Sequence, residues 1–187
     1  TVFDEMTNLS FPVLTAVGVA FSPTSLPLLT TLSAPSLMWC GSTMSAGTSC
    51  ALVTLSLPSL YYVGGGININ TASTLKSLLM PSLVTCQSFS IQTMGITNLS
   101  LPSLNYIGGS VSFSIASCAS LTTVSMPSLI QCTGSMNINN GNGAVQNITI
   151  GTAGTLKSIG GNIAFQNQAL SQSSVNDMLV LLAGLDG

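Results

Sequence analysis

The hydrophobic residues of this chain recur with two periods at once. Within short segments they alternate with polar residues, as in Val111-Ser-Phe113-Ser-Ile115, which is the pattern of a β-strand with one buried face. Over longer distances, these segments return together with a Pro-Ser-Leu-like turn about every 23 residues. A fixed period of this length is typical of a solenoid, in which each repeat forms one coil and stacks on the next.

Proline holds the same place in six copies of the repeat. The prolines are Pro12, Pro35, Pro58, Pro81, Pro102 and Pro127, so the intervals are 23, 23, 23, 21 and 25 residues. Because proline cannot donate a hydrogen bond to a strand ladder, it predicts a strand end or a corner of the coil. The glycines that follow Ile or Val in the Ile-Gly-Gly segments are interpreted in the same way, as positions that need an unusual backbone angle.

Stacking of such repeats places equivalent residues in columns. The residues five positions after the prolines are Val17, Cys40, Val63, Cys86, Ile107 and Cys132. Cysteine alternates there with branched aliphatic residues, which predicts a buried column in which the thiols act as small hydrophobic groups. Successive cysteines are two coils apart, about 9.5 Å at ~4.8 Å per coil, too far for a disulfide. The total of five cysteines is odd, and a Cys40–Cys50 bridge within one coil is the remaining alternative.

These patterns predict a mainly β protein in two parts. Residues 1–170 are expected to form a leucine-rich-repeat-like parallel β-solenoid of about seven coils of about 23 residues. Residues 171–187 are expected to form a C-terminal helical cap, because an open solenoid end is a sheet edge that would otherwise pair with other chains.

The cap is predicted from a change of period after Gln168. Ser173 or Ser174 is the expected N-cap, Asp177 should complement the helix start, and Gly184 suits the helix end. The residues expected on the buried face, at spacing i, i+3, i+4 and i+7, are Val175, Met178, Leu179 and Leu182.

The composition changes this picture mainly through its lack of charge. Only 3% of the residues are charged, against ~25% in typical proteins. Apolar runs such as Met178–Leu182 are far shorter than the ~20 residues of a membrane-spanning helix, so no membrane span is expected. Two lysines and a net charge of -2 argue against a nucleic-acid partner, which needs a basic face. So little repulsive charge favours self-association, unless an extracellular setting merely tolerates it.

Catalytic chemistry finds little support in the sequence. The chain has no histidine, and its four carboxylates lie near the termini, so no acid and base can pair within the repeats. The thiols of the cysteine column lie coils apart without histidine companions, which argues against a metal site. We therefore expect no enzyme activity, no cofactor and no bound metal.

A row of hydroxyl and amide side chains is the candidate binding surface. Positions four and two before the prolines carry Thr31, Ser33, Thr54, Ser56, Ser77, Asn98, Ser100, Thr123 and Ser125, with Leu79 as the partner of Ser77. Each pair is i, i+2 on a strand, so both side chains face one side. Stacked coils would combine them, with Asn8, Ser10, Asn147 and Thr149, into a flat uncharged array spaced about 4.8 Å by 6.8 Å. Alternatively, exposed strand positions of a chain with so little charge simply have few other residues available.

The fullest copy of the repeat lies between Leu101 and Leu129 and reads P-S-L-x-x-I-G-x…F-x…C-x-x-L-x-x-V-x-M-P. It resembles the BspA-like leucine-rich repeats of bacterial surfaces, whose consensus has Pro, Ile-Gly, Phe, Cys and Leu in that order. The segment Gly65–Ile69 is also similar to repeats of receptor L-domains. The resemblance covers about Met6 to Ile163. The matching residues are Pro102, Ile107, Gly108, Phe113, Cys118, Leu121, Val124 and Met126.

Two functions of different class follow. The resemblance implies an extracellular structural or adhesive module of a cell surface or virion surface. Its partner would be another copy or another surface or virion protein, and glycan binding by the loop Asn139–Gly143 is a variant. The regular Thr/Ser/Asn row instead favours an ice-binding solenoid.

Overall fold

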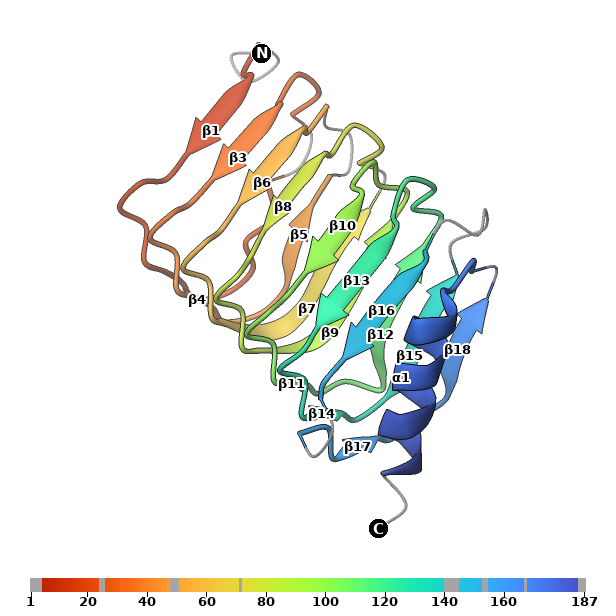
Figure 1. Cartoon of the computed structure of the whole chain (residues 1–187). Coiled ribbons are helices and arrows are strands. Elements are labelled where there is room, and N and C mark those ends of the chain that lie inside the picture. The colour runs from red at the N-terminus through yellow and green to blue at the C-terminus, as the bar shows by residue number, and fades with distance from the viewer. Residues whose placement is uncertain are drawn as a thin grey trace.

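The computed structural model describes residues 5–23, 26–47, 51–70, 72–139, 145–152, 155–166 and 168–184. The chain winds into a stack of parallel strands closed at its C-terminal end by one helix (Figure 1). The predicted parallel β-solenoid with a C-terminal helix is therefore confirmed.

One face of the solenoid, the ladder face, consists of the strands that precede the prolines. They fall into a four-stranded and a three-stranded parallel sheet. Since seven such strands follow one another, the chain makes six full turns between the first and the last. The first sheet contains β1 (Asn8–Ser10), β3 (Thr31–Ser33), β6 (Thr54–Ser56) and β8 (Ser77–Leu79), and the second contains β10 (Asn98–Ser100), β13 (Thr123–Met126) and β16 (Asn147–Ile150).

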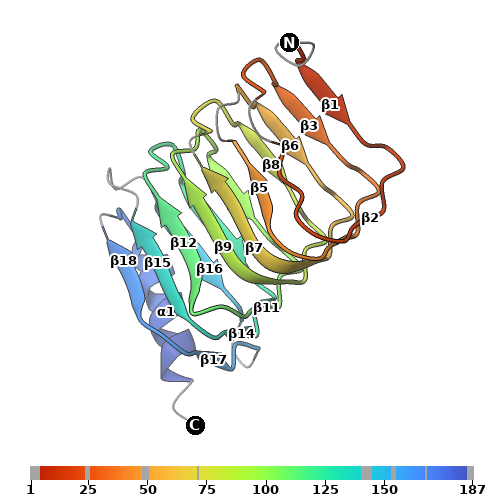
Figure 2. The same cartoon turned by 180° about the vertical axis from the view of Figure 1, so that it is seen from behind.

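The described strands outside the ladder face form one parallel sheet of 11 strands, the broad sheet, which covers the opposite face and curves around one side of the solenoid (Figure 2). It runs without interruption along the solenoid. Its strands are β2 (Ala16–Val17), β4 (Trp39–Cys40), β5 (Met44–Ala46), β7 (Tyr62–Asn70), β9 (Thr85–Gln92), β11 (Tyr106–Ile107), β12 (Val111–Ala116), β14 (Gln131–Cys132), β15 (Ser135–Asn139), β17 (Ser158–Ile159) and β18 (Ile163–Gln166).

The prolines start the turns that leave the ladder face, as predicted. The backbone N–H of Leu60 donates to the carbonyl of Leu57 at 3.2 Å, so Pro58 occupies the second position of a four-residue turn, where its fixed φ is favourable. The Ser59 hydroxyl donates to the carbonyl of Pro35 in the preceding coil at 2.6 Å. The Pro-Ser-Leu motif thus makes the turn and also joins it to its neighbour.

The glycines of the Ile-Gly-Gly segments have a different role from the one predicted. Among the described glycines, positive φ occurs at Gly47 and Gly151, which lie outside these segments. A Cβ at Gly64 would instead collide with the carbonyl oxygen of Gly41, and one at Gly41 with that of Gly18. Successive coils approach too closely here for any side chain, so the requirement is for space and not for an unusual angle.

The core consists of apolar columns in the predicted register. Strand pairing aligns the column Val17, Cys40, Val63, Cys86, Ile107, Cys132 and Ile159. A second column contains Met44, Ile67, Phe89, Phe113, Met136 and Ile163. Cys40 is a free thiol, so the alternative Cys40–Cys50 bridge is wrong; Cys50 itself lies outside the described residues.

The helix α1 (Gln172–Ala183) begins earlier than predicted and ends where predicted. Its N-cap is Ser171, whose hydroxyl accepts a hydrogen bond from the Ser174 N–H at 3.2 Å, and neither Ser173 nor Ser174 caps the helix. Because of this earlier start, Asp177 lies beyond the first turn, which contains no acidic residue. Gly184 is the C-cap, as predicted.

The buried face of α1 is also rotated from the predicted one. Met178 is buried and Val175 and Leu182 are half-buried as expected, but Leu179 is 61% exposed and Leu181 packs against the core in its place. The rotation follows from Ser174, which is the buried polar residue of the described core. Its position directs Ser174, Met178 and Leu181, at i, i+4 and i+7, toward the last coil.

Ser174 replaces the strand that would follow β16. Its hydroxyl accepts from the backbone N–H of Ile148 at 2.9 Å and donates to the carbonyl of the same residue at 3.2 Å. One side chain thereby satisfies both the N–H and the C=O of Ile148, which lie at the open edge of β16. Figure 1 shows the helix lying over this end of the stack. The predicted capping of the C-terminal coil is thus achieved with a specific hydrogen-bond pair.

We expect Ser174→Ala to lower the free energy of unfolding by about 1–3 kcal/mol, because it leaves the buried N–H and C=O of Ile148 without partners. Urea unfolding measures the loss, and amide exchange should accelerate at Ile148. The matched control is Ser173→Ala on the exposed side of the helix, which should stay within about 0.5 kcal/mol of the parent. Equal effects of the two substitutions would contradict this role of Ser174.

Candidate functional site

The candidate binding residues of the first four coils lie side by side on the ladder face. Strand register aligns Thr31, Thr54 and Ser77 in one row, and Ser33 and Ser56 in a second row. The leucines between the two rows, such as Leu32 and Leu55, are fully buried. The hydroxyls therefore point outward, as their i, i+2 spacing predicts.

The remaining candidates form a separate array on the second sheet. Asn98 aligns with Thr123 and Asn147, and Ser100 aligns with Ser125 and Thr149. Because β8 does not pair with β10, the array is divided in two between Ser77 and Asn98. The prediction of one continuous flat array is therefore wrong, and its second row is also interrupted by Leu79, which is 48% exposed.

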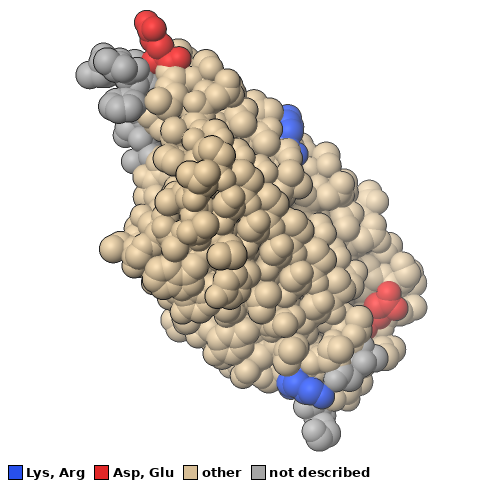
Figure 3. All heavy atoms as spheres, turned by 90° about the vertical axis from the view of Figure 1, so that its left-hand side faces the viewer, with Lys and Arg blue, Asp and Glu red and all other residues tan. Residues whose placement is uncertain are grey.

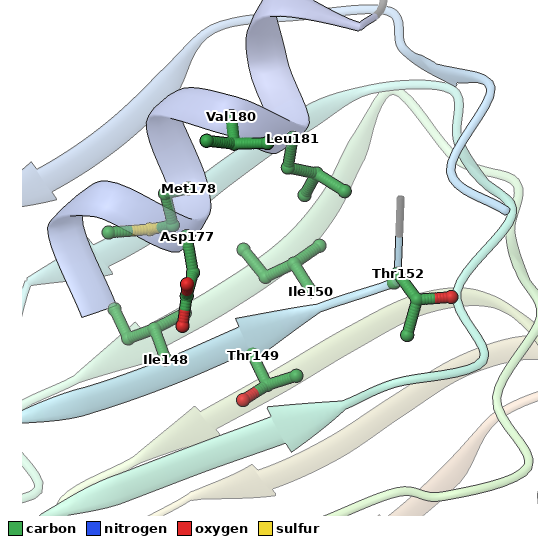
Figure 4. Close-up of a pocket in the computed structure, with 9 residues that line it drawn as sticks. Ile148, Thr149, Ile150, Thr152, Asp177, Met178, Val180 and Leu181 are labelled. Carbon is green, nitrogen blue, oxygen red and sulfur yellow. The ribbon is translucent and has the colours of Figure 1, made fainter. Parts of the chain in front are cut away.

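A groove of about 310 Å³ lies between β16 and α1, and Figure 4 shows the side chains that line it. Ile148, Ile150, Met178 and Leu181 make it largely apolar. Asp177 is its one titratable side chain among the described residues. The groove thus offers one carboxylate without a second acid or base, and the described part of the chain supplies no pair for proton transfer there.

Two thiols of the core, those of Cys86 and Cys118, are poor nucleophiles. Burial, and to a smaller extent the neighbouring Cys132, raises the pKa of Cys86 to about 12. Burial also raises the pKa of Cys118, against the opposing effect of hydrogen bonds from the backbone of Met94 and Thr93. Both side chains are therefore protonated at neutral pH. Because only a thiolate attacks a substrate or binds a metal ion, neither thiol is reactive in this form. Within the described residues, no three His, Cys, Asp or Glu side chains gather as a metal site would require.

The structure brings together a group of aromatic residues that sequence reasoning missed. The chain has one tryptophan and three tyrosines, and all four stand where a coil enters the broad sheet. We call Met38, Trp39, Tyr61 and Tyr62 the aromatic ridge; Tyr106 lies two coils further on. The signal was present in the sequence, because Trp39, Tyr62 and Tyr106 each directly precede a residue of the cysteine column.

The ridge is ordered and accessible. Trp39 and Tyr62 are in register on adjacent strands, with ring centroids 6.3 Å apart and an interplanar angle of 13°. Tyr61 is 48% exposed and Met38 is 47% exposed. Figure 3 views the side of the molecule on which β4 lies in Figure 1, and its charged side chains stand only near the margins of that view. The residues of β2 and β9 that are in register with Trp39 and Tyr62 are uncharged as well, so the ridge lies on an uncharged surface.

The fold and its outer surface define the class of this protein as a β-solenoid repeat protein. No protein-family model, curated protein or solved structure matches the chain. None of the helical residues that the structure describes forms a segment long and apolar enough to cross a membrane.

Proposed function

We propose that this protein is a non-enzymatic structural or adhesive module of an extracellular assembly on a cell or virion surface. The observation that carries the proposal is the aromatic ridge on a solenoid with almost no charge. Tyrosine and tryptophan side chains dominate the energetics of many interfaces, because they bury a large rigid surface and retain a polar group for hydrogen bonding.

The absence of charge near the ridge indicates the kind of partner. No ionic contact can direct binding there, so the partner surface should be neutral, as in a second copy of the chain, another surface or virion protein, or a glycan. The resemblance of the repeats to BspA-like surface proteins supports the same class of function. The protonated thiols and the lone carboxylate beside α1 support a non-enzymatic role.

The ridge can be tested with a double substitution, Trp39→Ala with Tyr62→Ala. We expect binding to isolated native cell or virion surfaces, or assembly seen by electron microscopy and sedimentation, to weaken at least about tenfold, as for loss of an interface hot spot. Ile130→Ala is the matched control, because Ile130 is an exposed apolar residue at the position equivalent to Tyr61. A parent protein that stays monomeric and binds no surface material would exclude the proposal.

Ice binding remains the second proposal, supported by the in-register rows of Thr31 with Thr54 and Ser33 with Ser56 on neighbouring strands. The division of the array between β8 and β10 limits the flat surface to four strands and three strands. Freezing-point measurement on the parent protein separates the two proposals. Thermal hysteresis would favour ice binding, and its absence would exclude it.

A further inference from the structure

The division of the ladder face creates an open groove between β8 and β10. Most pairs of Cα atoms with one atom in β8 and one in β10 are more than 8 Å apart, whereas neighbouring strands of a sheet are about 4.8 Å apart. The space between them is a groove of about 320 Å³, lined among others by Lys76, Leu78, Asn98 and Ser100. Figure 1 shows the two strands spread apart while the strands behind them remain evenly stacked.

The groove arises because the connection that leads into β10 is one residue shorter than the equivalent connections. Ile69, Ile91 and Ile115 are aligned in the broad sheet, so they mark equivalent points of three coils. Asn98 follows Ile91 by seven positions, whereas Ser77 follows Ile69 by eight, as Thr123 follows Ile115. The chain therefore reaches β10 with one residue fewer and does not place it against β8.

The backbone of β8 is open toward the groove. In a parallel strand, successive residues direct their N–H and C=O groups to opposite sides. Ser77 donates to Val53 at 3.1 Å and Leu79 accepts from Leu57 at 2.9 Å, so these two residues bond toward β6. Leu78 lies between them and directs its N–H and C=O into the groove, where no described strand pairs with it.

The backbone of β10 is open toward the same groove. Thr97 accepts from Thr122 at 2.8 Å and Leu101 donates to Ser125 at 2.9 Å, so these residues bond toward β13. By the same alternation, Asn98 and Ser100 direct their backbone groups toward β8. Two strand edges thus face each other, and two strand spacings, about 9.6 Å, are what one further strand between them would need.

We propose that this groove binds an extended peptide segment of a partner protein, which inserts as a strand between β8 and β10. Main-chain hydrogen bonds to Leu78 on one side and to Asn98 and Ser100 on the other would hold it, as in other cases of strand addition. The inserted strand joins the two sheets of the ladder face into one. This site is separate from the aromatic ridge and does not depend on the function proposed for it.

The groove also selects the side chains of the segment. Leu78 is half-buried, whereas its column neighbours Leu32 and Leu55 are fully buried, so an apolar residue of the segment should cover it. Lys76 is the one cation among the described groove residues. It favours an acidic residue at that end of the segment, directly across from it on the inserted strand.

The probe is the peptide Glu-Thr-Leu-Ser-Leu, which copies residues 53–57 with glutamate in place of Val53. In the register that β6 has with β8, its glutamate aligns with Lys76 and its first leucine with Leu78. We expect fluorescence anisotropy to detect binding of the labelled peptide to the full chain. At saturation, amide exchange at Leu78, Asn98 and Ser100 should slow at least tenfold.

Two variants test the backbone contacts. Ser100→Pro removes an N–H that faces the groove and leaves the bonds of β10 to β13, so it should weaken binding at least tenfold. A peptide N-methylated at its first leucine tests the same bonds with the protein unchanged, and it should not bind. The Trp39→Ala, Tyr62→Ala protein should bind the peptide like the parent.

A charge test completes the experiment. Lys76→Gln should weaken binding of the glutamate peptide but should not change the affinity for a peptide that has glutamine in place of the glutamate. The proposal is overturned if the peptide gives no exchange protection in the groove, or if protection occurs only at the outer edge of β1. Equal binding of the N-methylated peptide would overturn it as well.

Discussion

Replacing Phe89 with alanine is expected to lower the free energy of unfolding by about 3–5 kcal/mol. The Phe89 side chain is fully buried and stacks on Phe113 of the next coil, with ring centroids 5.8 Å apart and an interplanar angle of 17°. Truncation would leave a cavity in the middle of the stack, where neither end can close over it. Equilibrium unfolding in urea, followed by circular dichroism, measures the loss.

The column that contains Phe89 supplies the control. Because methionine fills the same column at Met44 and Met136, Phe89→Met should cost less than half as much as the alanine change. The double substitution Phe89→Ala with Phe113→Ala should show a coupling of about 0.5–1.5 kcal/mol between the rings. A loss below about 1 kcal/mol for Phe89→Ala would mean that the column packing contributes little to stability.

Raising the pH above 9 is expected to destabilise the fold through Cys86. Its pKa is raised from 9.0 to about 12 in the folded state, chiefly by burial. Below pH 9 the thiol is protonated in both states, and the stability is fully present. Above pH 9 the unfolded chain loses the proton first, so stability should fall by about 1.4 kcal/mol per pH unit, or about 4 kcal/mol by pH 12. Urea unfolding between pH 8 and pH 11 measures this slope.

The Cys86→Val variant separates this effect from other alkaline titrations. Valine occupies the equivalent position at Val63 of the preceding coil, so the substitution should cost less than about 1.5 kcal/mol at pH 7. Above pH 9, the free energy of unfolding of the variant should fall less steeply with pH than that of the parent, by about 1.4 kcal/mol per pH unit. If Cys86 of the folded parent reacted with iodoacetamide at pH 7 as rapidly as in the unfolded chain, its proposed burial would be disproved.

Much of the fold could be predicted because the repeat carries its own register. Proline fixes the corner of each coil, and counting five residues from it gave the column that strand pairing produces from Val17 to Cys132. The register does not depend on the details of side-chain packing, because a shift of one residue along a strand would place its polar side chains in the core. The outward direction of the Thr and Ser rows follows from the same alternation.

The division of the ladder face could not be predicted from the proline intervals. An interval of 21 residues shows that a coil is short but not where the residues are missing. One residue is missing between Cys86 and Phe89, where a register shift in the broad sheet accommodates the loss. The other is missing before Asn98, where the ladder face divides into two sheets. The next coil is longer between Ile107 and Phe113, and a register shift accommodates the excess there.

The buried face of α1 and the aromatic ridge escaped prediction for different reasons. Apolar spacing made Leu179 equivalent to Met178, but the hydrogen bonds of Ser174 to Ile148 decide which side of the helix turns inward. A single repeat does not reveal the ridge, because each of the two coils supplies only one ring of the stacked pair. The alignment of Cys40 with Val63 already places Trp39 beside Tyr62, and the pairing of β4 with β7 shows that their rings form one surface.

The unequal continuity of the two faces gives the molecule a preferred direction of bending. The broad sheet pairs β7 with β9 and β9 with β12 along the whole stack, whereas on the opposite side β8 and β10 are not paired. Bending that moves β8 away from β10 stretches no ladder between those strands, whereas bending that stretches the broad sheet works against every strand pair in it. The solenoid is thus a rod with one compliant point, whose stiffness depends on the direction of the load.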